Sequence, residues 1–132
     1  AGIFNLENID ILDYRIAGNI LETAGDTIVE LSKSISGTSL SGIDQKKIYD
    51  IAKDIEKIQK KSIDAFITNN RPLAIEAIKI HKQYQEKISR IRSSLEHKKQ
   101  APIAFLDLIH IFEKIAQSWS DISDLVQPTY RK

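Results

Sequence analysis

The chain has 132 residues, of which 42% are hydrophobic and 28% charged, and its formal net charge is +1. This length is about one domain, and the near-neutral charge gives no basis for a general attraction to nucleic acid or to membrane surfaces. Cysteine is absent, which excludes disulfides, zinc–thiolate sites and thiol nucleophiles within this sequence. Charges interrupt every apolar run, so we expect no membrane span and a cytoplasmic protein.

Two further features concern the origin of the chain. It contains no methionine and begins Ala1-Gly2, so we expect a trimmed piece of a longer reading frame. Isoleucine is the dominant apolar residue, lysine and glutamate are plentiful, and the thermolabile Cys and Met are missing. This balance is typical of a thermophile.

The first predicted helix covers residues 5 to 36. Its apolar residues recur at helical spacing: Ile9, Leu12, Ile16, Ile20, Ala24, Ile28, Leu31 and Ile35. Gly37 is suited to terminate it. Gly18 and Gly25 lie inside and each weakens the helix by ~1 kcal/mol relative to Ala, which favours close packing against a neighbour.

A second helix is predicted to run to about Thr68, after a connector in which Ser41 and Asp44 have capping-box spacing. A break at residues 69–72 follows, and Pro72 suits the first turn of a third helix. The stripe of the third helix is Ala74, Ala77, His81, Tyr84, Ile88, Ile91 and Leu95. His81, placed on an apolar stripe, is interpreted as a core residue rather than a ligand.

The fourth helix organises the chain and covers residues 105 to 126. Its apolar stripe is Phe105, Leu108, Phe112, Ile115, Trp119, Ile122 and Val126, and its opposite side carries a polar ladder of His110, Glu113, Gln117, Asp121 and Asp124. The stripe is built to be buried, and the ladder either holds a cation or faces water. We expect Ile55, Tyr84, Ile88, Phe112, Ile115 and Trp119 to be buried together.

These elements predict an all-α fold, an antiparallel helical bundle of four long helices, because no segment alternates with the period of a strand and the connections are short. Enzyme signatures are missing: there is no phosphate-binding glycine loop or nucleophile elbow, and Asp107-x-x-His110 occurs once where a di-iron bundle needs two such motifs. We therefore expect no enzyme.

One candidate metal site remains, on the first helix. Glu22 and Asp26 lie one turn apart on the same face, and hard divalent cations prefer carboxylate oxygens. The alternative, which spacing alone favours, is two solvated acids near Arg15 and Lys33.

Two segments resemble the L-E-R-I-G/A-D helix motif of the PhoU family. They are LETAGD at residues 21–26 and FEKIAQ at residues 112–117, the second followed by DISD at residues 121–124 where the family has N-I-A-E. Residues 44–95 also resemble the family's middle helices. The resemblance implies that residues 1–36 are the last helix of a first PhoU-like repeat and that residues 43–127 are a whole three-helix repeat.

The resemblance further implies a regulator of phosphate uptake or phosphate signalling, acting through contacts with a phosphate transporter component or a sensor or regulatory protein. It implies a metal (Mg, Mn, Fe or Zn) on Glu22 and Asp26, and on the second motif at Glu113, Gln117, Asp121 and Asp124. Gln117 stands where the family has Asp, which removes a charge, and Thr23 and Lys114 replace the motif's arginine. Some relatives carry an AbrB-like DNA-binding domain upstream, and we expect no direct nucleic-acid contact from this segment.

The competing hypothesis is a helical dimerisation or interaction module of a transcriptional regulator with no metal role. Under either hypothesis we predict a homodimer. Tyr14, Ala17 and Leu21 widen the apolar stripe of the first helix beyond what one partner surface needs, and Gly18 and Gly25 allow close approach.

Overall fold

The computed structural model describes residues 8–36, 42–96 and 103–126, which form four α-helices and no strand. They are α1 (Asn8–Ser36), α2 (Gly42–Thr68), α3 (Arg71–Glu96) and α4 (Ile103–Val126). The all-α prediction is confirmed, and the predicted helices agree with these bounds to within a few residues. Gly37 and Ser41, which the sequence offers as terminator and cap, lie outside the described residues.

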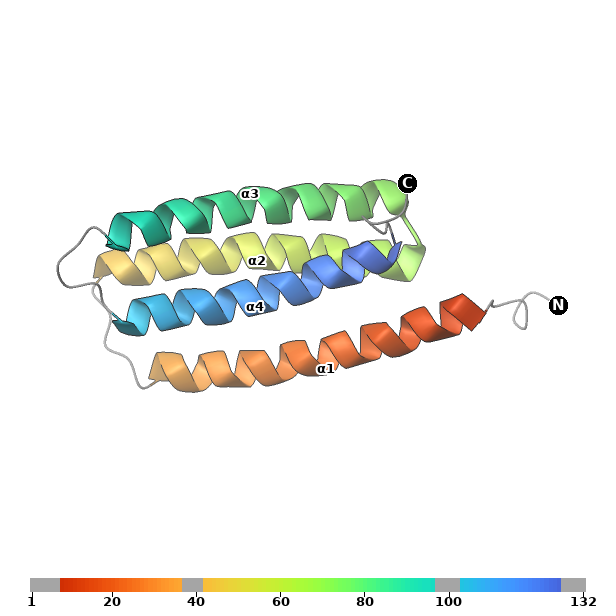
Figure 1. The fold of residues 1–132 in the computed structure, drawn as a ribbon, viewed down its shortest axis with the longest axis horizontal. Helices are drawn as coiled ribbons and strands as arrows, with labels where there is room; N and C mark the ends of the chain where they lie inside the picture. Colours follow the sequence, from red (N-terminus) through yellow and green to blue (C-terminus); the bar gives the residue numbers. More distant parts are fainter. Residues whose placement is uncertain (1–7, 37–41, 97–102, 127–132) are drawn as a thin grey trace.

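Consecutive helices alternate in direction, and α2, α3 and α4 pack together as a three-helix bundle (Figure 1). In this bundle α4 contacts both α2 and α3, and α2 and α4 run the same way. The fourth member, α1, lies at the edge of the molecule along α4. Among the described residues, no Cα of α1 comes within 8 Å of a Cα of α2 or α3.

The position of α4 at the centre explains its composition. All seven residues of its predicted stripe are buried, as are Ile109, Ile111 and Ala116 beside that stripe. A helix that is covered by three neighbours has to be apolar over more than one face. The sequence predicted burial of one side of α4, and the buried surface is wider than that. The polar ladder still occupies a separate face of the helix. The six residues expected to be buried together belong to one core cluster.

The turn between α2 and α3 is encoded by two asparagines. Asn69 has a φ of 50°, the left-handed conformation that asparagine tolerates, and ends α2. The backbone N–H of Asn70 then donates to the carbonyl of Ala65 at 2.9 Å. The Asn70 side chain caps α3, because its Oδ1 accepts a hydrogen bond of 3.1 Å from the N–H of Leu73. Pro72 lies in the first turn of α3, as predicted.

Polar contacts between the helices fix their positions along the bundle axis. Inside the bundle, Ser123 on α4 donates a 2.7 Å hydrogen bond to Ser62 on α2, and both side chains are fully buried. At the surface, ion pairs join neighbouring helices: Lys61 to Glu76, Lys87 to Asp54, Arg92 to Glu113, and Lys114 to Glu30. Of these four pairs, the last one reaches α1.

The side of α1 that faces α4 is lined by small residues. Ala17, Ala24 and Thr27 are buried, and Ile20 and Leu31 are partly buried between them. Small side chains let two helix backbones approach closely, so α1 packs against α4 through this line of small residues. The larger residues of the predicted stripe, Ile28 and Ile35 among them, are displaced to the flank and stay exposed. Within the described part of the chain, no helix is long and apolar enough to cross a membrane.

Candidate functional site

The polar ladder of α4 faces the space between α1 and α3. Glu113 bonds to Arg92 of α3, while Thr23 and Thr27 of α1 border the same open groove. The groove is lined by Thr23, Thr27, His110, Glu113, Lys114, Gln117, Ser118 and Asp121. Three of the predicted metal ligands on α4 therefore share one groove wall.

These ladder side chains are already engaged with protein groups. The amide of Gln117 donates a 2.8 Å hydrogen bond to Oδ1 of Asp121. Asp121 also acts electrostatically on His81 of α3, and burial lowers the pKa of His81 while this carboxylate opposes the shift. His81 is buried and stacks on Tyr84 with ring centroids 6.2 Å apart, which confirms its interpretation as a core residue. Asp124 is half-buried near the end of α4.

Glu22 and Asp26 lie elsewhere. Both are exposed on α1, on the side opposite Ala24, and neither lines the groove. The structure thus separates the six predicted ligands into a pair on α1 and a set on α4. In residues 8–36, 42–96 and 103–126, no three His, Cys, Asp or Glu side chains are grouped so as to hold a metal ion. Metal binding stays a prediction.

The opposite flank of α1 faces α2 across a second, apolar groove. At its middle the floor is formed by Phe112, Ile115 and Trp119 of α4, with Ile28 and Leu31 on one wall and Ala52 and Ile55 on the other. The indole N–H of Trp119 is buried here and has no hydrogen-bond acceptor among the described residues. We call this feature the α1–α2 groove.

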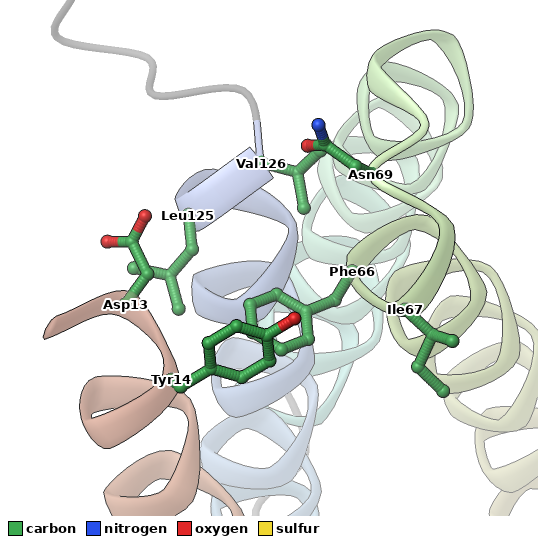
Figure 2. A pocket seen from close by; sticks show the side chains of 7 residues that line it. All are labelled: Asp13, Tyr14, Phe66, Ile67, Asn69, Leu125 and Val126. Carbon is green, nitrogen blue, oxygen red and sulfur yellow. The ribbon is translucent and has the colours of Figure 1, made fainter. Parts of the chain in front are cut away.

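Figure 2 shows a separate pocket of about 210 Å³ where α1, α2 and α4 meet. The ring of Tyr14 lies edge-on to that of Phe66, with centroids 5.3 Å apart and an interplanar angle of 76°. Leu125 of α4 lines the pocket beside Asp13, and Val126 lines it beside Asn69. Tyr14 remains 58% exposed, so this aromatic contact covers only part of its ring.

Exposed apolar side chains concentrate on α1. Of the twelve large hydrophobic residues exposed in the described part of the chain, eight belong to this helix: Ile11, Leu12, Tyr14, Ile16, Leu21, Ile28, Val29 and Ile35. The sequence had indicated Tyr14 and Leu21 as excess apolar surface, and both are exposed. Ala17, predicted with them, is instead buried against α4. A concentration of this kind on one helix is a mark of an interaction surface.

Part of this surface follows a regular repeat that sequence reading missed. Residues at steps of three and four follow the flank that faces the α1–α2 groove, and from Tyr14 onward they alternate between large and small: Ile11, Tyr14, Gly18, Leu21, Gly25, Ile28, Ser32 and Ile35. We call this line the large–small stripe. Its spacing is that of a coiled-coil seam. This spacing is visible in the sequence, but the apolar stripe predicted for the same helix drew attention away from it.

The glycines of the large–small stripe have no packing role within the chain. A Cβ atom built on Gly18 or on Gly25 meets no heavy atom within 4 Å. The expectation that these glycines serve close packing against a neighbour is thus not met by any helix described within the chain, and close approach of a second chain stays a prediction. Each still lowers the stability of α1 by ~0.5–1 kcal/mol relative to alanine.

Comparison with known proteins gives no match, because no family model fits the sequence and no curated protein or solved structure is significantly similar to the chain. The PhoU resemblance therefore stays a prediction carried by its short motifs, and the geometry of α1 is the strongest indication of what the chain does.

Proposed function

We propose that this chain is a protein-interaction module that docks a partner through the exposed apolar flank of α1. The observation that carries the proposal is the position of α1. Its backbone packs closely only against α4, with Tyr14 reaching Phe66 of α2, and it exposes eight large apolar side chains, whereas the three-helix bundle exposes four. Burial of apolar area is the main driving force of protein association. A partner that docks on this flank therefore gains the most binding free energy.

The rest of the molecule is suited to a scaffold role. The bundle of α2, α3 and α4 holds a continuous core. Interhelical ion pairs and the buried serine pair fix the position of each helix along the bundle axis. A rigid support of this kind presents α1 in one orientation, which lowers the entropic cost of docking.

A photo-activated cross-linking amino acid tests this proposal directly. Introduced at Leu21 or Ile28, it should form a covalent protein adduct on illumination in the cells that make the chain. The matched control is Ile75 on α3, which is also exposed but lies away from α1. Adducts from α1 positions and none from Ile75 support the proposal. Absence of adducts at both α1 positions would overturn it.

A more specific role is favoured by the PhoU-like motifs together with the arrangement of one helix beside a three-helix bundle. On this reading the module regulates phosphate uptake by contacting a transporter component or a sensor or regulatory protein. Cells carrying a Leu21→Lys/Ile28→Lys chain should then lose the dependence of phosphate uptake on external phosphate, and cells carrying Ile75→Lys should keep it. An unchanged response in the double variant would exclude this role and leave the interaction module in place.

A further inference from the structure

From the large–small stripe we infer that the partner docked on α1 is a second copy of this chain, with the two α1 helices antiparallel about a two-fold axis near Thr23. The inference rests on the proposed function and specifies its partner. It follows from three observations: the exposure of Leu21 and Ile28, the empty space over the glycines of the stripe, and the way the stripe complements itself.

Two large residues in the middle of the stripe stay about half exposed within the chain. Leu21 and Ile28 are 46% and 45% exposed, although they lie on the side of α1 that borders α2. The space above Gly18 and Gly25 is open. A helix that keeps two glycines in its interior and uses neither for its own packing has room for another helix to approach closely there.

The order of large and small residues selects the antiparallel arrangement. With the axis near Thr23, Leu21 of one protomer lies over Gly25 of the other, and Ile28 over Gly18. Tyr14 lies over Ser32 in the next layer. In these three kinds of layer a large side chain faces a small one, which fills the interface without gaps or clashes, and the outermost layer pairs Ile11 with Ile35. A parallel pair would instead set glycine against glycine and leucine against leucine, which alternates gaps with crowded layers.

The strip on α1 supplies about half of the contact area of a standard stable dimer. Residues 11–35 of α1 span about 37 Å at the α-helical rise, and a strip about 10 Å wide covers on the order of 400 Å² of α1. The partner helix also lies over the α1–α2 groove, whose floor includes Trp119 and whose far wall carries Ala52 and Ile55 beside Glu56 and Gln59. The strip on α1 alone is about half of the roughly 800 Å² per partner of a standard stable interface, and the groove adds to it.

The register has one electrostatic consequence. It brings Glu22 next to its symmetry mate, near the axis. Both carboxylates are exposed, so the repulsion is modest and is screened by salt. The dimer should accordingly be no weaker at 0.5 M than at 0.05 M salt, unlike an interface held by ion pairs.

Light scattering provides the first test. At micromolar concentration the mass should be about twice the 15.0 kDa of the chain. Leu21→Lys/Ile28→Lys should raise the dissociation constant at least tenfold and leave the helical circular dichroism unchanged, because both side chains are exposed in the protomer. Ile75→Lys is the control and should leave the dimer intact. A wild-type mass of one chain would overturn the inference.

Cysteine variants test the orientation, since the natural sequence contains no thiol. Gly18→Cys and Ile28→Cys, oxidised as a mixture, should form a cross-linked heterodimer, because the two positions face each other in the antiparallel register. Each variant alone should not cross-link, since like positions are then about 15 Å apart along the helix. Cross-linking of each variant alone would overturn the antiparallel register.

An exchange of large and small residues checks the complementarity itself. Gly25→Leu should weaken the dimer, because the new side chain meets Leu21 of the partner. The double variant Leu21→Gly/Gly25→Leu should restore it, because each layer again pairs large with small. Failure of this rescue, with the single variant dissociated, would overturn the register. If photo-cross-linking at Leu21 instead captures only a different protein, the second-copy inference falls and the interaction module stands.

Discussion

Nη2 of Arg92 on α3 donates a 2.8 Å hydrogen bond to Oε2 of Glu113 on α4. Both side chains are about one third exposed, so the pair lies at the boundary between the bundle and water. A carboxylate that the PhoU resemblance offers to a metal is thus held by a guanidinium, and the same contact joins α3 to α4.

We expect the Arg92–Glu113 pair to contribute a small, salt-sensitive stabilisation. A double-mutant cycle with Arg92→Ala and Glu113→Ala should give a coupling of ~0.5–1 kcal/mol in urea unfolding at low salt. The coupling should shrink in 1 M NaCl, because exposed charges are screened. The more exposed pair of Lys61 and Glu76 is the control and should couple less. Zero coupling at low salt would show that the pair is not formed in solution.

Loss of one partner in the buried serine pair should destabilise the bundle more than loss of both. Ser62→Ala or Ser123→Ala leaves a buried hydroxyl without its partner and should cost ~1–3 kcal/mol. The double alanine variant removes both polar groups and should cost less than the sum of the single changes. Additive single effects in chemical denaturation would contradict the pairing.

Truncation of the large core residues of α4 should have the greatest effect. Phe112→Ala or Trp119→Ala should each cost ~3–5 kcal/mol, since both side chains are 4% exposed. Trp119→Phe is the matched control, because it keeps most of the apolar volume and removes the indole N–H that has no acceptor in the described structure. We expect that change to cost much less than the alanine variant. A loss under about 1 kcal/mol for Trp119→Ala would place this residue on the surface.

His81 should make the protein less stable in mild acid. Burial lowers its pKa below the usual 6.5, so the unfolded chain takes up a proton at a higher pH than the folded chain does. The stabilisation is fully present above about pH 6.5 and is lost as the pH falls from there to the lower pKa of the folded state, by up to ~1.4 kcal/mol per pH unit.

His81→Gln should flatten this part of the pH profile. Asp121→Asn should extend the sensitive range to lower pH, because this carboxylate opposes the shift. Unfolding free energies measured between pH 5 and 7.5 provide the comparison. Identical slopes for wild type and His81→Gln would exclude the mechanism.

Metal binding is tested by thermal melts with Mn²⁺ or Mg²⁺, the ions that carboxylate ligands favour. If Glu22 and Asp26 bind the ion in the folded state, the melting temperature should rise with metal concentration. Glu22→Ala/Asp26→Ala should abolish that rise, and Asp121→Ala reports separately on the α4 ladder. No shift of the wild-type melting temperature at millimolar metal would remove the metal hypothesis for both places.

Much of the architecture could be predicted because helical periodicity is a local property. The stripes of α3 and α4 each carry large apolar residues on one line, so their buried sides were identified without knowledge of the neighbours. The α2–α3 turn was equally local, since asparagine at a left-handed position and proline in a first turn need only adjacent residues.

The orientation of α1 was decided by the tertiary structure alone. This helix is apolar over much of its circumference, so periodicity does not determine which line meets α4. Contact with α4 selected Ala17, Ala24 and Thr27, because small side chains permit close approach, and left Leu21 and Ile28 on the flank.

The relation between the two acidic motifs was likewise beyond the sequence. The spacing within each helix placed Glu22 near Asp26 and Gln117 near Asp121, which are contacts one turn apart. Whether the two motifs meet depends on the rotation of α1 relative to α4, and whether Glu113 is free depends on Arg92, 21 residues away on another helix. Both properties depend on how the helices pack. The rotation of one helix against another is set by contacts between residues far apart in the sequence, and residue spacing within a single helix does not reveal these contacts.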